Sequence, residues 1–233
     1  MTKLTDSMLL ALDTATDLAS IALYDGGRVV SEHTWHSARR HTVELMPDVD
    51  ALLTQAQMTP AQLSAVAVAL GPGSFTGLRV ALSLAKGLTL ALSLPLLGVP
   101  TLDVVAYPHQ AQPLPVCAVI QAGRGRLCWG LYRHGDGGWG TVTGYHVSPI
   151  DDVAARLADV SEPILFSGEI LLPNADRLRT LLGDRFTLAS PALRLRRAGV
   201  LAEIAWARWQ AGQVDDPATL SPIYLHEPAG DAA

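Results

Sequence analysis

Residues 65–94 read AVAVALGPGSFTGLRVALSLAKGLTLALSL, and this stretch decides the fold. It begins with a short apolar segment at 65–70, which is typical of a buried strand. A Gly-rich turn at 71–77 follows, and Ser74 is placed to cap the first free N–H groups of a helix. We expect that helix to cover residues 75–94. A strand that runs through a turn into a helix indicates an α/β protein.

The expected helix at 75–94 carries only two charges, Arg79 and Lys86, and apolar residues lie all round it. A helix of this kind is buried on every side, either by its own chain or by another. An earlier stretch, 39–57, has one apolar helical face. We therefore predict that the two helices form a surface for a partner protein or a second copy. The candidate contact residues are Leu45, Val49, Leu52, Leu82 and Ala85.

The pattern of the first half recurs in the second. Residues 8–12 form an apolar run that is followed by a polar turn, a second apolar run and a Gly-rich turn, and residues 116–120 begin the same order. This predicts a duplicated α/β fold with mixed sheets flanked by helices. The expected halves are residues 1–108 and 109–233, with the last helix a candidate to pack back on the first half.

Composition narrows the functional classes. Of 233 residues, 49% are hydrophobic and 17% charged, and the formal net charge is -5. Tight binding of nucleic acid by the chain alone is not expected, because phosphate binding needs several convergent cations. The densest basic cluster is interpreted as a solvated face; it consists of Arg194, Arg196 and Arg197.

No secretory leader or membrane span is apparent, so we expect a cytoplasmic protein. The uncharged run at 87–102 is too short for a span and contains Pro95, Gly98 and Pro100. Cys117 and Cys128 are interpreted as buried free thiols, since no secretory signal supports a disulfide.

The Gly-rich turn has two interpretations. It could present backbone N–H groups to a phosphate, or it could be a tight turn that lets the helix pack closely on its strand. It lacks the lysine of a P-loop and the spacing of a dinucleotide fingerprint. Asp13, at the end of the first strand, could act through water on a metal-bound phosphate or cap its own turn. The remnant of a phosphate site would consist of Asp13, Gly71, Gly73 and Ser74.

The histidines give no metal-binding spacing. There is no HExxH and no HxxxH, and His36 and His41 are five positions apart, which does not suit one metal on a straight helix. They are interpreted as surface or capping residues. We expect no bound metal, and spacing alone reveals no catalytic residues.

Three segments resemble one family: LLALDTATDLASIALYDGG (9–27), RRHTVELMPDVDALL (39–53) and the stretch 63–103 around GPGSFTGLR. The family is the dimerisation subunit of the bacterial tRNA threonylcarbamoyladenosine synthase, the TsaB/YeaZ type. In the second half the resemblance is carried by SGE (167–169) and SPIYL (221–225). It implies a duplicated actin-like ATPase fold and a role in modifying the adenosine beside the tRNA anticodon.

The resemblance also implies which member of the complex this is. The related catalytic subunit binds a metal through an HxxxH whose histidines fall on Thr101 and Val105 here, and neither residue can replace an imidazole. Members commonly show an Asp-Ala-Arg turn where this chain has Gln121-Ala122-Gly123, which weakens a phosphate contact in the second half. The resemblance therefore implies a non-catalytic scaffold.

The partners implied are the catalytic threonylcarbamoyl-transferring subunit and an ATPase subunit, with a homodimer when the chain is alone. Transfer RNA is expected only through the complex, and ATP or ADP only weakly, at the complex interface. Two alternatives remain open from the residues. One is an actin-fold ATPase or small-molecule kinase that works through Asp13 and the turn, and the other is a metallopeptidase.

Overall fold

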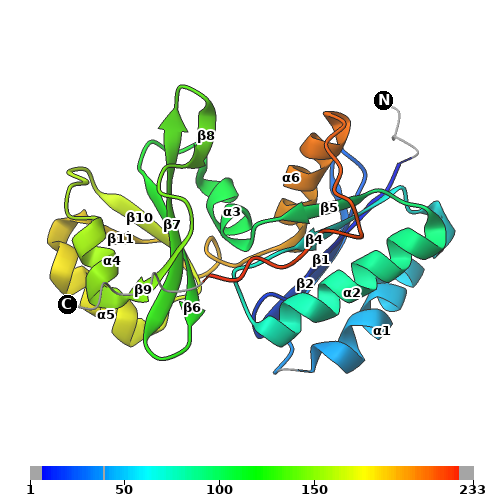
Figure 1. Cartoon of the computed structure of the whole chain (residues 1–233), viewed down its shortest axis with the longest axis horizontal. Helices are drawn as coiled ribbons and strands as arrows, with labels where there is room; N and C mark the ends of the chain where they lie inside the picture. Colours follow the sequence, from blue (N-terminus) through cyan, green and yellow to red (C-terminus); the bar gives the residue numbers. More distant parts are fainter. Residues whose placement is uncertain (1–6, 39, 226–233) are drawn as a thin grey trace. The chain divides into compact units, whose positions relative to one another are not determined.

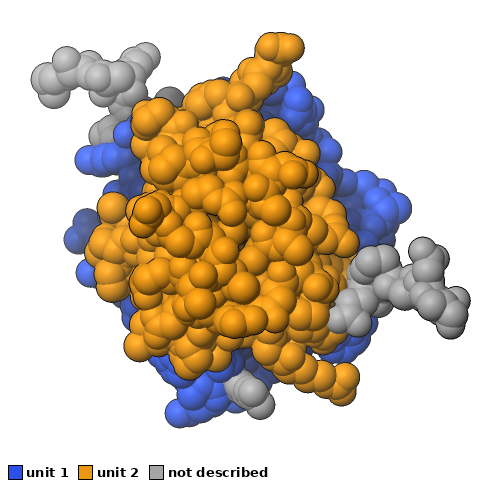
Figure 2. Space-filling view, turned by 90° about the vertical axis from the view of Figure 1, so that its left-hand side faces the viewer, with its two compact units in different colours: residues 1–104, 196–223 blue, residues 105–195, 224–233 orange. Residues whose placement is uncertain are grey.

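A computed structural model describes residues 7–38 and 40–225. The chain forms two compact units, residues 1–104 with 196–223 and residues 105–195 with 224–233 (Figure 2). These units differ from the halves expected at 1–108 and 109–233. The difference arises because the segment 196–223, which includes the last helix, packs with the first unit.

The first unit is built on a five-stranded sheet in the order β3-β2-β1-β4-β5 (Figure 1). Its strands are β1 (Leu9–Asp13), β2 (Leu18–Tyr24), β3 (Val29–His36), β4 (Ala65–Ala69) and β5 (Leu96–Val99). The helices α1 (His41–Gln55), α2 (Phe75–Leu92) and α6 (Ala198–Gln210) belong to this unit, and α3 (Thr101–Ala106) begins in it.

The second unit has its own sheet in the order β11-β10-β6-β7-β8, with β9 paired to β7. The strands are β6 (Val116–Ala122), β7 (Arg126–Gly135), β8 (Gly138–Thr141), β9 (His146–Pro149), β10 (Ile164–Gly168) and β11 (Phe186–Leu188). Helices α4 (Ile150–Arg156) and α5 (Leu172–Leu182) pack against each other and on this sheet.

The two sheets have the same plan. In the first, β1 pairs antiparallel with β2 and parallel with β4; in the second, β6 pairs antiparallel with β7 and parallel with β10. The outer strands also correspond, β3 with β8 and β5 with β11. The predicted duplication is therefore confirmed in the order and direction of the strands.

Alternation along β1 explains the layers of the first unit. Leu10 and Leu12 join the core under α1 and α2, whereas Leu9 and Ala11 join a separate core under α6. Successive side chains of a strand point to opposite faces, so the helices cover the sheet on both sides. A strand that is buried on both faces has a continuous run of apolar residues in the sequence, as MLLAL at residues 8–12 does.

By length and composition alone, α2 could cross a membrane, a test that core helices of soluble proteins also pass. In this structure α2 lies on the sheet of the first unit. Its buried residues are Gly77, Leu78, Ala81, Leu82, Ala85 and Thr89.

Close packing at the start of α2 explains one glycine of the turn. A Cβ at Gly77 would lie 2.1 Å from the carbonyl oxygen of Thr14, which no real contact allows. The hydroxyl of Thr14 donates to the carbonyl oxygen of Gly77 over 2.7 Å. The turn between β1 and β2 is thus in direct backbone contact with the helix. Gly87, further along α2, has nothing within 4 Å of the corresponding position.

We predict opposite effects for the same substitution at these two glycines. Gly77→Ala forces the helix away from the Thr14 carbonyl and should lower the free energy of unfolding by several kcal/mol, on the order of a severe overpacking change. Gly87→Ala should leave it unchanged or raise it by about 0.5–1 kcal/mol, since alanine restricts the unfolded chain. Urea denaturation measures both. Equal effects at the two positions would contradict the packing argument.

Candidate functional site: a groove between two helices and a closed carboxylate site

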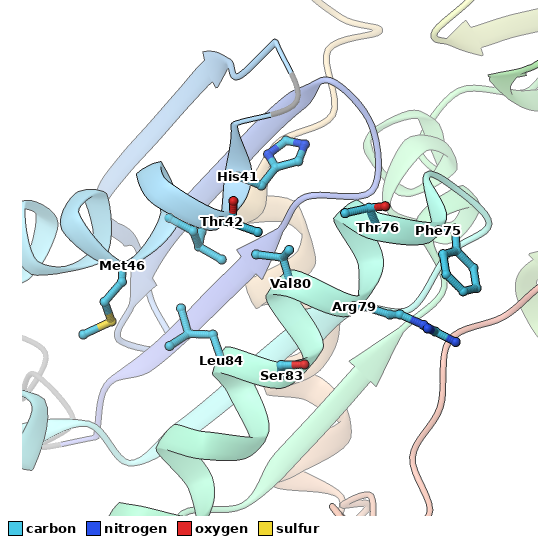
Figure 3. Close-up of a pocket in the computed structure, with 10 residues that line it drawn as sticks. His41, Thr42, Met46, Phe75, Thr76, Arg79, Val80, Ser83 and Leu84 are labelled. Carbon is cyan, nitrogen blue, oxygen red and sulfur yellow. The ribbon is translucent and has the colours of Figure 1, made fainter.

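A groove of about 570 Å³ lies between α1 and α2 in the first unit (Figure 3). Val80 and Leu84 point from α2 toward α1, and Thr42 and Met46 approach from the α1 side, whereas Arg79 points from α2 away from α1. The groove is lined by His41, Thr42, Leu45, Met46, Phe75, Thr76, Arg79, Val80, Ser83 and Leu84. Its floor is apolar and its rim carries hydroxyl groups and one guanidinium.

Large apolar side chains are exposed on both helices. On α1, Val43 is 60% and Met46 46% exposed; on α2, Phe75 is 54% and Leu90 84% exposed. The guanidinium of Arg79 lies over the Phe75 ring, 3.7 Å from its centroid. Exposed apolar surface that flanks a groove is typical of a site that another protein covers.

The five residues that the sequence suggested for this contact are buried within the unit, although Leu45 also lines the groove. Leu45, Val49, Leu52, Leu82 and Ala85 belong to the core between the helices and the sheet, with exposed fractions from 0% to 6%. The amphipathic face of α1 was identified correctly but assigned to the wrong neighbour. An apolar helical face packs first on its own sheet, and what remains for a partner lies on the opposite side of the helix.

Asp13 forms a closed polar site at the end of β1. Its carboxylate is fully buried and accepts a hydrogen bond from Arg196 Nε over 2.5 Å and another from the N–H of Ala15 over 2.9 Å. Arg196, 2% exposed, also donates from Nη2 to the Thr16 hydroxyl and to the carbonyl oxygen of Leu18. Both carboxylate oxygens therefore have protein donors.

The basic cluster was interpreted as a solvated face, and for Arg196 that interpretation is wrong. Arg197 forms a more exposed pair with Glu32. No spacing in the sequence distinguishes Arg196 from its neighbours, because its partner Asp13 is 183 positions away. Only the packing of α6 on the first sheet brings the two together.

Two other members of the suggested phosphate remnant, Gly73 and Ser74, contact Ala15, whose N–H is bonded to Asp13. Ser74 donates its N–H to the Ala15 carbonyl oxygen over 2.6 Å, and its hydroxyl accepts from the N–H of Gly77. A Cβ at Gly73 would lie 2.3 Å from that same carbonyl oxygen. The geometry supports the tight-turn interpretation of the Gly-rich segment. The Gly-rich turn packs against the turn between β1 and β2, and the Asp13 carboxylate there accepts its hydrogen bonds from Arg196 and Ala15.

Two positions that the resemblance singled out, Thr101 and Gln121, have structural contacts of their own. The buried Thr101 hydroxyl accepts the N–H of Gly71 over 2.9 Å, and the Thr101 N–H donates to the Gly71 carbonyl oxygen, so this residue holds the Gly-rich turn. In the second unit Gln121, the counterpart of Asp13, accepts a hydrogen bond from Asn174 Nδ2 over 2.9 Å.

His41 differs from the surface or capping residue that was expected, and His109 is buried as well. His41 is 5% exposed in the first turn of α1 and bonds to the backbone of Thr16, while its Nδ1 has no partner. His109 Nε2 lies 2.8 Å from the Ser167 hydroxyl in the second unit. Burial lowers the pKa of both imidazoles. At His41 the nearby carboxylates of Asp17, Glu44 and Asp13 act in the other direction and raise the pKa, but burial outweighs them.

The cysteines match their interpretation. Cys117 and Cys128 are buried and free. Burial raises the pKa of the Cys117 thiol far above its usual range and that of Cys128 to about 11, so both remain protonated near neutral pH.

We predict a strong coupling between Asp13 and Arg196. Arg196→Met leaves a buried carboxylate without its ionic partner and should cost about 3–5 kcal/mol of unfolding free energy. Asp13→Asn should cost a similar amount, since it leaves the guanidinium buried. The double variant should cost less than the sum of the two, because no charge is then stranded. Simple additivity in urea denaturation would show that the pair is not coupled.

We predict that the protein loses stability in mild acid. The folded pKa of His41 and of His109 lies below the ordinary value of 6.5, so the unfolded chain binds these protons more readily. The free energy of unfolding should therefore fall as the pH decreases below about 6.5. The double variant His41→Gln/His109→Gln should show a shallower fall over the same range. A variant profile parallel to the wild type would rule out these residues as the cause.

Comparison with known proteins agrees with this geometry. A family model described as TsaD, tRNA N6-adenosine threonylcarbamoyltransferase, matches residues 28–169. The TsaB protein of Escherichia coli, named for tRNA threonylcarbamoyladenosine biosynthesis, is 33% identical over 76% of this chain and 87% of its own length. The Bacillus subtilis protein of the same name is 30% identical over 83% of this chain and 85% of its own length.

A solved structure supports the same assignment. YeaZ from Pseudomonas aeruginosa is 30% identical and superposes with a TM-score of 0.75 over 94% of this chain and all of its own. The duplicated sheets described above are thus the two halves of an actin-like fold. These matches confirm the resemblance that the Gly-rich turn and its flanking helix suggested, and the chain belongs to the TsaB/YeaZ family.

Proposed function

We propose that this chain is a non-catalytic subunit in the formation of threonylcarbamoyladenosine in tRNA. In this role it holds the catalytic, TsaD-type subunit on the groove between α1 and α2. The names of the TsaB relatives support the pathway. The observation that carries the proposed role is the groove itself, which is apolar, open and bordered by the exposed side chains of Val43, Met46 and Phe75.

The state of Asp13 supports a role without catalysis by this chain. A carboxylate that orients a metal-bound water needs an oxygen that is open to solvent, as in phosphoryl-transfer enzymes. Here both oxygens accept hydrogen bonds from Arg196 and Ala15, and the side chain is fully buried. This weighs against the alternative of an autonomous ATPase or kinase. Thr101, which holds the Gly-rich turn, weighs against a metallopeptidase.

The remaining partners follow from the same proposal. An ATPase subunit completes the complex, and weak ATP or ADP binding belongs to the complex interface. The acidic chain meets tRNA only through its partners, because few basic side chains are available to release counterions. The proposal places the protein in the cytoplasm, where tRNA is modified.

We predict that Met46→Glu separates folding from assembly. Met46 is 46% exposed, so a glutamate there should leave the unfolding free energy unchanged. Against a partner the same carboxylate would be buried and unpaired, which should weaken binding of the catalytic subunit by at least about 100-fold. Modified adenosine, measured by nucleoside mass spectrometry in a reconstituted reaction, should fall in parallel.

The matched control is Val142→Glu, which places the same charge at a similarly exposed apolar position, 53% exposed, in the second unit. It should retain both binding and modification. A folded Met46→Glu protein that supports full activity would exclude the groove as the docking surface. Modification by this chain without any catalytic subunit would overturn the non-catalytic role.

A further inference from the structure

The rim of the groove carries a stacked pair of side chains at the start of α2. Phe75 is the first residue of the helix and Arg79 lies one turn later, so the two side chains are neighbours on the helix surface. The guanidinium carbon of Arg79 lies 3.7 Å from the centroid of the Phe75 ring. Figure 3 shows both side chains on the side of α2 that faces away from α1. The pair therefore borders the groove and is not part of its apolar floor.

A partner can reach both members of this pair. The Phe75 ring is 54% exposed although the guanidinium lies over it, and Arg79 is exposed as well. Stacking on the ring restrains the guanidinium, whereas a long side chain that is surrounded by water samples many conformers. Binding then costs less side-chain entropy, because fewer conformers are lost. Arginine and aromatic side chains are also the residues that most often dominate the binding energy of protein interfaces.

The chemistry of the guanidinium indicates what it binds. Its planar group presents N–H donors at a fixed spacing that matches the two oxygens of a carboxylate. Both charged residues within α2 are basic, Arg79 and, two turns further on, Lys86. Tight binding of an RNA backbone needs more convergent cations than these two, and the chain has a net charge of -5. This side of α2 therefore suits an acidic side chain of a protein better than an RNA strand.

We propose that Phe75 and Arg79 form an anchor for the catalytic subunit, in which Phe75 restrains the guanidinium and Arg79 binds an aspartate or glutamate of that subunit. The anchor rests on the proposed function, in which the catalytic subunit covers this side of the first unit, and it names the chemistry that the subunit brings to α2. Arg79 is then a specificity-determining residue, since a partner without an acidic group at this place leaves the guanidinium without its carboxylate.

Three variants test the anchor through the dissociation constant for the catalytic subunit, measured by isothermal titration calorimetry. Arg79→Met keeps an apolar stem but removes the charge, and it should weaken binding by about 30-fold or more. Arg79→Lys keeps the charge but loses the planar group, and it should weaken binding by about tenfold. Phe75→Leu keeps an apolar side chain but removes the ring, and it should weaken binding by about fivefold.

The matched control is Arg156→Met, which removes an exposed arginine from α4 in the second unit. It should change the dissociation constant by less than about twofold. Urea denaturation checks that every variant folds, and the unfolding free energy should change little because Phe75 and Arg79 are exposed. A loss of binding in a stably folded variant then comes from the contact itself.

Two further measurements separate recognition from a merely structural role. Because Phe75 acts in part through Arg79, the double variant Phe75→Leu/Arg79→Met should lose less affinity than the product of the two single losses. Full additivity would show that the ring does not act through the guanidinium. Wild-type affinity should also fall between about 0.1 M and 0.5 M salt, and the affinity of Arg79→Met should fall less over the same range.

A cross-link identifies the acidic group directly. Arg79→Lys places a primary amine at this position, and a water-soluble carbodiimide joins an amine to a carboxylate as an amide while the reagent itself becomes a urea. With saturating catalytic subunit, mass spectrometry should find residue 79 linked to an aspartate or glutamate of that subunit. The wild-type chain contains only two lysines, Lys3 and Lys86, so few other amines compete.

The negative outcomes distinguish the anchor from the proposal on which it rests. If Arg79→Met binds the catalytic subunit like the wild type while Met46→Glu does not bind it, the groove is the docking surface and only the anchor is wrong. If neither variant weakens binding, the docking surface is wrong as well. If Arg79→Met leaves the protein complex intact but weakens tRNA binding by that complex, the guanidinium meets a phosphate and the anchor is overturned.

Discussion

The buried ion pair between Asp13 and Arg196 is the contact on which the first unit depends. It joins the end of β1 to the residues that begin α6, across 183 positions of sequence. Next to it, the N–H of Ala198 donates to the Ser20 hydroxyl and that of Gly199 to Glu32, so the start of α6 is bonded to β2 and β3. The helix thereby covers the second face of the sheet. A buried pair of this kind is weak evidence for net stability but strong evidence for position, because either charge alone would be costly there.

The same pair has a functional consequence. In an actin-like fold the Gly-rich turn and the carboxylate at the end of β1 are arranged as a phosphate site would be, and here the two do lie together around Ala15. The carboxylate, however, is engaged by a cation from its own chain. The same fold can therefore surround a carboxylate that is open to a ligand or one that is bonded by its own chain, in keeping with the rule that function belongs to sites rather than to folds. What stays open in this unit is the helix groove, whose apolar floor suits a protein better than a nucleotide.

The groove and the core are two sides of the same helices. On α2, Leu82 and Ala85 pack on the sheet, while Ser83 and Leu90 are exposed. Because α2 is apolar all round, its sequence does not indicate which side faces the sheet. That side is decided only when the helix packs on the sheet. The charged residues within α1 are acidic and those within α2 are basic, so the remaining surface carries opposite charges on its two sides.

The sequence by itself determined the repeated strand order, the two long groove helices and the family, because apolar period and turn chemistry are local signals. Residues 65–94 alone specified β4, the turn and α2 to within a few positions. It did not determine which faces of α1 and α2 are exposed, so Leu45 and Leu82 were assigned to a partner although they belong to the core. It offered the last helix only as a candidate to pack on the first half, and it did not show that Arg196 is buried. These features rest on contacts between residues far apart in the chain, and such contacts exist only once the strands and helices have packed.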